Sequence, residues 1–254
     1  MSDGRKEKVK IQVSKSFNSL LVLDRLHFSV YENEFLVIVG PTGCGKTTLA
    51  HIIGGLYQPT EGQVTFDGEI ISPKRHNLSF VFQEPSCIPW RTLWDDIKIG
   101  LEIKKSKPAA IQRRVKEMIE LVQLTGFENY YPYQISGGMK QRVAIARAYA
   151  TDPDLLLMDE PFGHLDAQTR YLMQIEITRV WEQLKKTVLF VTNNIEEAVF
   201  LAERIIILSR LPAHIKGIVP VDLPRPRDNI SSDFLAIRSQ ITQMCETADE
   251  EKRG

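Results

Sequence analysis

The sequence predicts an α/β fold with a largely parallel sheet. Two apolar runs, Phe35–Val39 and Leu155–Met158, have the length and composition of buried strands. From Leu155 to Ser209 helical patterns alternate with further apolar strands, an order that indicates parallel strands covered by helices. Between the two runs, the pattern is helical from Trp94 through Gly126, which predicts a helical subdomain inserted into the sheet domain.

The first of these strands leads into a glycine-rich loop, which fits the pattern G-x-x-x-x-G-K-T. Glycines let backbone N–H groups turn inward without Cβ clashes, and a helix that starts near Lys46 adds the positive end of its dipole. Lys46 is expected to reach the β- and γ-phosphates, and the Thr47 hydroxyl to bind Mg²⁺. A turn that binds nothing is disfavoured, because strand, spacing, lysine and hydroxyl agree. The loop residues expected to hold a nucleotide are Gly40, Pro41, Thr42, Gly43, Cys44, Gly45, Lys46, Thr47 and Thr48.

The second strand delivers two acids, Asp159 and Glu160, to its carboxyl end. In open α/β sheets ligands bind at that edge. We expect Asp159 to hold Mg²⁺ and Glu160 to polarise the water that attacks the γ-phosphate. The alternative is an exposed acidic turn that caps the next helix. Together with the loop, the acids predict a P-loop NTPase (RecA-like) core.

A second helix N-terminus also suits an anion. Ser136, Gly137 and Gly138 open the strongly helical run Met139–Ala150. The chain has one γ-phosphate to bind, yet it carries two candidate phosphate-binding segments, the glycine-rich loop and this helix N-terminus, about 90 residues apart. This predicts a site made by two chains.

In this combination the chain resembles the ATP-binding-cassette (ABC) transporter ATPases, from about Val9 to Arg227. The resemblance implies that a signature segment contacts ATP held by the loop of a second ATPase subunit, in a homo- or heterodimer. It implies that Gln83 touches Mg²⁺ and the attacking water, although an ordinary loop glutamine is the alternative. The signature residues are Ser136, Gly137, Gly138, Met139 and Gln141.

Two further roles follow from the resemblance, each with an alternative. Phe17 takes the place of the aromatic residue that stacks on adenine, although a lone phenylalanine near a strand end usually belongs to a core. Asp166 matches the acid that crosses the dimer interface, and it could equally cap the helix that begins at Ala167.

Two positions depart from the family pattern. Asn193 stands where relatives usually carry a histidine, and an amide can donate a hydrogen bond but cannot titrate. We expect slow but real hydrolysis, because phosphoryl transfer relies mainly on positioning and electrostatics. His164 replaces a small residue in the loop expected at the dimer interface; an exposed histidine without a role is the favoured interpretation.

The run Val81–Leu93 and the shorter runs Asp159–Gly163 and Leu223–Arg227 are similar to those of an importer subgroup. That subgroup takes up nitrate, sulfonates, taurine and related small organic solutes. The resemblance implies transmembrane permease subunits as partners, a solute-binding protein as an indirect partner, and a place on the cytoplasmic face of the membrane. Pro89, Trp90 and Leu93 lie where the family docks the permease, and Trp90 is either an exposed anchor or packed inside the helical subdomain. A cassette that binds ATP but barely hydrolyses it remains the nearest alternative, because of Asn193.

Composition limits the other function classes. The 254 residues carry 32 basic and 32 acidic side chains, so no electrostatic footprint for nucleic acid is present. No apolar run is long enough to span a bilayer, and the charged first ten residues do not suit a secretory signal. Cys44, Cys87 and Cys245 suggest reduced thiols without metal-ligand spacing. A soluble cassette protein of translation or repair lacks its usual second cassette or long insertion, and a kinase or GTPase lacks the signature.

The chain is expected to divide into four segments. Residues 1–83 form the β-subdomain and first part of the nucleotide-binding core, 84–150 the helical subdomain with the signature, 151–215 the second part of the core, and 216–254 a C-terminal extension. The other expected strands are Lys8–Val13, Leu26–Val30, Gln63–Phe66, Val188–Thr192 and Arg204–Ser209; the other expected helices are Ala167–Leu184, Ile195–Glu203 and Phe234–Met244, with Leu223–Arg227 as a linker.

Overall fold

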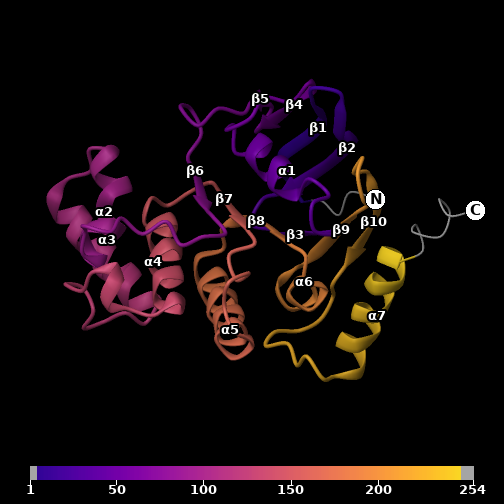
Figure 1. Cartoon of the computed structure of the whole chain (residues 1–254). Coiled ribbons are helices and arrows are strands. Elements are labelled where there is room, and N and C mark those ends of the chain that lie inside the picture. Colours follow the sequence, from indigo (N-terminus) through magenta and orange to yellow (C-terminus); the bar gives the residue numbers. More distant parts are fainter. Residues whose placement is uncertain (1–4, 247–254) are drawn as a thin grey trace, which may run out of the picture. The chain divides into compact units, whose positions relative to one another are not determined.

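The computed structural model describes residues 5–246 (Figure 1). In it the chain forms two compact units. The first unit takes in the described residues up to His76 and from Lys186 onward, and the second is Asn77–Lys185. The fold is of the α/β class, as expected from the sequence. The four segments expected from the sequence are a different division of the chain and stay a prediction.

An antiparallel sheet forms the N-terminal part of the first unit, as expected. Its strands follow the order β2-β1-β4-β5. Along β1, Val9, Ile11 and Val13 are buried while their neighbours are more exposed, which is the period of two that a half-buried strand requires. The strand bounds are β1 Glu7–Phe17, β2 Leu20–Tyr31, β4 Glu61–Phe66 and β5 Glu69–Ile70.

Four further strands of the first unit follow the order β10-β9-β3-β8, with β3 parallel to both neighbours. Every residue of β3 is buried, so the apolar run needs no alternation. β10 is antiparallel to β9 and was not expected, because Ile215–Pro220 is short and ends in proline. The bounds are β3 Phe35–Val39, β8 Thr187–Thr192, β9 Arg204–Leu208 and β10 Ile215–Pro220.

A partly buried ion pair fixes β9 to the turn before β3. The Arg204 guanidinium donates from Nε to Glu34 Oε1 at 2.7 Å and from Nη2 to Glu34 Oε2 at 2.9 Å. Nη2 also donates to the Ser29 carbonyl at 2.6 Å, so the buried Glu34 carboxylate is paired with a cation that is itself hydrogen-bonded. This fork holds the amino ends of two core strands together.

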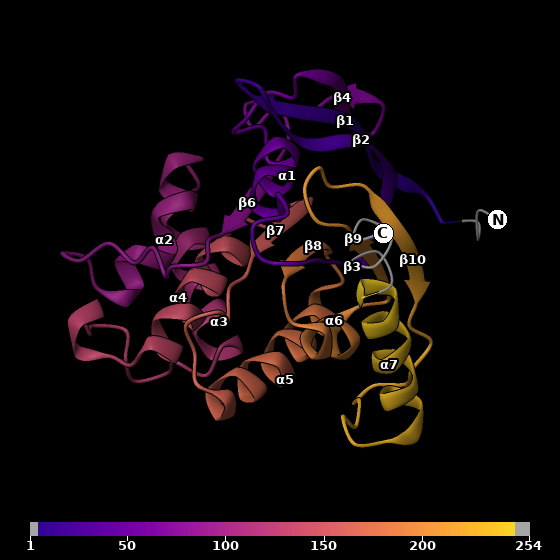
Figure 2. The ribbon, with the colours of Figure 1, turned by 45° about the vertical axis from the view of Figure 1, so that its right-hand side comes forward.

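Three helices complete the first unit: α1 Lys46–Ile53, α6 Ile195–Leu201 and α7 Ser232–Glu246. α6 ends two residues earlier than expected. α6 and α7 lie side by side in both ribbon views (Figures 1 and 2). Phe234 and Ile241 of α7 are completely buried, which accounts for the amphipathic pattern of this helix.

The second unit contains the helical insertion and a pair of parallel strands, β6 Leu78–Val81 and β7 Leu155–Asp159. The stretch expected to be helical resolves into two helices. Thr92 caps the first of them by accepting from the Asp95 N–H, and Pro108 starts the second. The helices are α2 Leu93–Ile103, α3 Pro108–Leu121, α4 Gly137–Ala150 and α5 Ala167–Leu184, with a short 3₁₀ helix at Pro132–Gln134.

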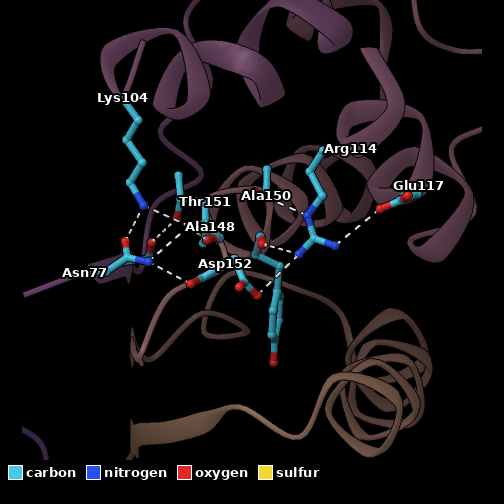
Figure 3. Close-up of polar contacts among 10 residues, drawn as sticks. Asn77, Lys104, Arg114, Glu117, Ala148, Ala150, Thr151 and Asp152 are labelled. Atoms are coloured by element: carbon cyan, nitrogen blue, oxygen red, sulfur yellow. Dashed lines mark hydrogen bonds and ion pairs between the residues drawn. The ribbon is translucent and has the colours of Figure 1, made fainter. Parts of the chain in front are cut away.

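Basic side chains hold the C-terminal end of α4 (Figure 3). Arg114 of α3 donates to the carbonyls of Tyr149 at 2.9 Å and Ala150 at 3.3 Å. Lys104, which follows α2, donates to the Thr151 carbonyl at 2.8 Å. These carbonyls lack partners within the helix, and cations at this end also favour the helix dipole. α4, which carries the predicted signature at its other end, is therefore fixed to both neighbouring helices.

Candidate functional site

The glycine-rich loop lies between β3 and α1 and depends on glycine at defined positions. Gly43 and Gly45 have φ angles of +78° and +104°, which disfavour other residues. A Cβ on Gly45 would lie 2.8 Å from Val22 Cγ1, and one on Gly40 would lie 2.9 Å from Cys44 Sγ. The loop is thus packed closely against its own unit.

Lys46 turns its side chain back into this loop. Nζ donates to the carbonyls of Gly40 and Pro41, both at 3.0 Å, and the residue is only 4% exposed. The ammonium group therefore lies inside the ring of the loop, where phosphate oxygens would meet it. Thr47 lies beside it on the first turn of α1 and is exposed. Backbone N–H groups, the lysine and the hydroxyl together suit a nucleotide phosphate.

Asn193 borders the same loop from the end of β8. Its Nδ2 donates to Thr42 Oγ1 at 3.4 Å. The residues on either side of it are fixed: Thr192 Oγ1 donates to Glu197 Oε2 at 2.7 Å, and the Asn194 side chain caps α6. The structure therefore places this position at the phosphate loop, with an amide in place of an imidazole.

Phe17 is not a core residue. It is 43% exposed at the end of β1, and its ring lies edge-on to Tyr57 with centroids 6.1 Å apart. The Lys15 ammonium lies over the Phe17 ring, 4.9 Å from the ring centroid. An exposed ring with a cation nearby can accept a stacked base, so the predicted adenine contact stays open.

In the second unit, the predicted acids and Gln83 lie at the carboxyl ends of the paired strands β7 and β6. Asp159 ends β7 and is 4% exposed, and Glu160 follows in the left-handed region with φ +41°. A Cβ built on Gly163 would lie 3.4 Å from Gln83 Nε2 and 3.3 Å from the Glu160 carbonyl. The sequence could not show this approach of residues 80 positions apart.

The signature segment forms the start of α4. Ser136 caps the helix by accepting from the Met139 N–H at 3.3 Å, and a Cβ on Gly138 would lie 2.8 Å from Thr169 Cγ2. Gln141 is 1% exposed, and among the described residues neither polar atom of its side chain has a hydrogen-bond partner. Its expected contact with a partner's ATP stays a prediction.

Asp166 is the N-cap of α5. Its carboxylate accepts from the Thr169 N–H at 3.0 Å, and this bond holds the pKa of Asp166 below its ordinary value. The capping alternative is therefore present in the structure, and a role at an interface remains a prediction. His164 is exposed, as the favoured interpretation has it.

The donor set expected for Mg²⁺ is a hydroxyl, an amide and a carboxylate, which are the oxygen ligands that this ion prefers. Thr47 belongs to the first unit, and Gln83 and Asp159 belong to the second. The chemistry of these residues fits the ion. Within residues 5–246, no group of three or more His, Cys, Asp or Glu side chains could hold a metal by itself.

The chain matches the ABC transporter family over residues 23–163. It belongs to this family. An uncharacterized ABC transporter ATP-binding protein of Methanocaldococcus jannaschii is 48% identical over 244 residues, covering 94% of this chain and 91% of the relative. The aliphatic sulfonates import ATP-binding protein of Bacillus cereus is 43% identical over 233 residues, covering 92% of each chain.

The fold, too, is similar to that of a solved ABC protein. A solved dimeric structure of a post-hydrolysis state of an ATP-binding cassette, bound to ADP and Pi, matches this ABC chain with a TM-score of 0.74. It is 32% identical, and the match covers 85% of this chain and 100% of that one. The ABC chain is thus an ATP-binding ATPase that converts ATP and water to ADP and phosphate. Among the described residues, no helix is long and apolar enough to cross a membrane.

The structure decides between the two interpretations of Trp90. It is 78% exposed, which excludes the alternative that it packs inside the helical subdomain of the isolated chain. Two arginines, in contrast, gave no signal of their contacts in the sequence. Arg225 and Arg227, expected only as parts of a linker, bond to α6. Spacing in a sequence cannot show which carbonyls a guanidinium will reach, because those contacts join distant segments.

Proposed function

We propose that this ABC chain is the ATP-hydrolysing subunit of an importer for a small solute of the nitrate, sulfonate or taurine kind. The observation that carries the proposal is the phosphate loop, with the Lys46 ammonium held at its carbonyls and Asn193 at its edge. The identity of 43% to an aliphatic sulfonates import ATP-binding protein supports the cargo class. The cargo itself does not contact the ATPase.

Each predicted residue has a chemical task in this proposal. Lys46 and the loop N–H groups bind the β- and γ-phosphates, and Phe17 stacks on adenine. Thr47, Gln83 and Asp159 hold Mg²⁺, which when bound supplies positive charge to the phosphate oxygens. Glu160 polarises the attacking water.

Asn193 positions the γ-phosphate by donating from its amide. Because the amide cannot accept or relay a proton at neutral pH, hydrolysis is slower than a histidine would allow. Glu160 retains the capacity to act as base, so hydrolysis continues.

Two copies arranged head to tail complete the site. Ser136, Gly137 and Gly138 of each copy contact the ATP that the other copy's phosphate loop holds, and Asp166 crosses between them. Closing of the dimer on ATP moves permease helices docked at Trp90, and hydrolysis reopens it. The chain then works on the cytoplasmic face of the membrane, beside permease subunits served by a solute-binding protein.

A hydrolysis-impaired regulatory subunit is the second candidate, favoured by Asn193 alone. Steady-state Mg-ATP hydrolysis by the purified chain, Glu160→Gln and Asn193→His separates the two. The motor predicts turnover in the wild-type chain, its loss in Glu160→Gln and a higher rate in Asn193→His. A wild-type chain that binds ATP but is as inactive as Glu160→Gln would establish the regulatory subunit instead.

A further inference from the structure

The C-terminal segment of the first unit packs against α6, the helix that follows Asn193. α6 has seven residues and begins directly after Asn194. The segment Val221–Ile241 contacts this helix at both ends, and α7 lies beside it (Figure 2). The segment holds no residue of the phosphate loop or of the signature.

At the C-terminal end of α6, the carbonyl groups are completely partnered. The Ala198 carbonyl accepts from the Ala202 N–H. Arg227 donates from Nη1 to the carbonyls of Val199 at 2.6 Å and Phe200 at 3.1 Å, and Arg225 donates to the Leu201 carbonyl. A helix leaves these last groups without internal partners, and cations at this end complement its dipole.

Arg227 is suited to hold this end rigidly. It is 6% exposed, and its Nη2 also donates to the Val221 carbonyl at 3.1 Å. A planar guanidinium fixes several carbonyls in one geometry, which a flexible ammonium group cannot do. The helix end and the linker are thereby tied to one buried side chain.

At the N-terminal end of α6, the same segment holds Glu196. Asn229 Nδ2 donates to Glu196 Oε1 at 3.2 Å, and Arg238 Nη1 of α7 lies 4.0 Å from Glu196 Oε2. Glu196 is in the first turn, and its N–H donates to the Asn194 side chain at 2.9 Å. Only Asn194 and Ile195 separate Glu196 from Asn193 in the sequence.

We propose that Arg227 and the Asn229–Glu196 contact are positioning elements for Asn193, which set the place of its amide at the phosphate loop through α6. The inference rests on the proposed role of Asn193. A displacement of a reacting group by about 1 Å can lower a rate by about 100-fold, so loosening α6 should slow hydrolysis. ATP binding should be retained, because Lys46 and the loop are held by contacts of their own.

The test measures kcat and KM for ATP in Arg227→Lys, in Asn193→Ala and in the double variant. We expect Arg227→Lys to lower kcat about 3- to 30-fold with KM within about twofold of wild type. In the Asn193→Ala background the same substitution should change kcat less than about twofold, because residues that act as a unit are not additive. A solely structural role would give the same fold-loss in both backgrounds and would overturn the inference.

A surface variant and a matched control keep the test informative if Arg227→Lys folds poorly. Asn229→Ala combined with Arg238→Ala should lower kcat in the same background-dependent way. Arg204→Lys removes a partly buried guanidinium of the same unit, bonded to Glu34 instead of α6, and should lower the melting temperature without lowering kcat.

The outcomes separate the inference from the proposed function. If the wild-type chain shows no ATP hydrolysis that Glu160→Gln abolishes, the proposed function is overturned, and the inference with it. Turnover that depends on Glu160 but is unchanged by Asn193→Ala would overturn the inference alone, because Asn193 would then have nothing to transmit.

Discussion

Asn193 Nδ2 lies 3.4 Å from Thr42 Oγ1, which joins the end of β8 to the phosphate loop. This contact gives the position a place at the site even though an amide replaces the usual imidazole. The hydrogen bond is long and the amide is exposed, so its energy is at the low end for such bonds.

This contact gives the first prediction. Thr42→Val removes the acceptor, and a double-mutant cycle with Asn193→Ala should show a coupling free energy of unfolding of about 0.5 kcal/mol. Thr42→Ser keeps the hydroxyl and is the control: because the hydrogen bond is retained, its cycle with Asn193→Ala should show a coupling free energy near zero. The coupling free energies are measured by urea unfolding. Equal values for Thr42→Val and Thr42→Ser would show that the hydroxyl does not contribute to the interaction with Asn193.

The second prediction separates the two roles of Asp166. Asp166→Asn keeps a side-chain acceptor for the Thr169 N–H, so the melting temperature should stay close to that of wild type, whereas Asp166→Ala should lower it. If the acid also serves the dimer, Asp166→Asn will reduce ATP hydrolysis in spite of its intact cap. Full activity in Asp166→Asn would limit the residue to capping.

The third prediction concerns docking of the permease at Trp90. Because this side chain is 78% exposed, Trp90→Ala should change the free energy of unfolding by less than about 0.5 kcal/mol. As an interface anchor it should account for about 2 kcal/mol or more of binding to co-expressed permease subunits. Ile103→Ala, with 75% exposure in the same unit, is the control. Equal permease binding by both variants would rule out an anchor at Trp90.

The fourth prediction compares two glycines of the antiparallel sheet. Gly62 and Gly68 have φ angles of +82° and +85°, but a Cβ on Gly62 would lie 2.0 Å from the Gln12 carbonyl, whereas one on Gly68 would meet nothing within 4 Å. Gly68→Ala should therefore lose about 1–2 kcal/mol of unfolding free energy from backbone strain alone. Gly62→Ala should lose about 3 kcal/mol or more, because the strand must also move. Similar losses in urea unfolding would contradict the close approach.

The fifth prediction is a pH dependence. Burial raises the pKa of the Cys87 thiol to about 11, and the negative charge of Asp96 acts in the same direction. Since only the thiolate reacts, about one thiol in 1,000 is reactive at pH 8, and the alkylation rate should rise about tenfold for each pH unit up to the pKa. Mass spectrometry of iodoacetamide-treated protein, with Cys87→Ser to assign the signal, measures this rate. A rate that levels off near pH 9 would contradict the burial of this thiol.

The family and the main elements could be predicted from the sequence, because they depend on local chemistry. The loop from Gly40 to Thr48 needs its glycines, lysine and hydroxyl in one continuous stretch, and apolar runs such as Phe35–Val39 are buried strands whatever surrounds them. The N-caps at Ser136 and Asp166 are equally local. The sequence alone therefore determined an ABC ATPase with a phosphate loop, a signature helix and two acids after a strand.

Only the tertiary structure decided the contacts between distant segments. It brought Asn193 to Thr42, buried Gln141, exposed Trp90 and tied Arg227 to the carbonyls of α6. A residue's type and spacing set its local backbone preference, but its neighbours across the fold depend on how the whole unit packs. The strand β10 and the contacts of the C-terminal segment escaped prediction for this reason: their partners lie on other elements of the first unit.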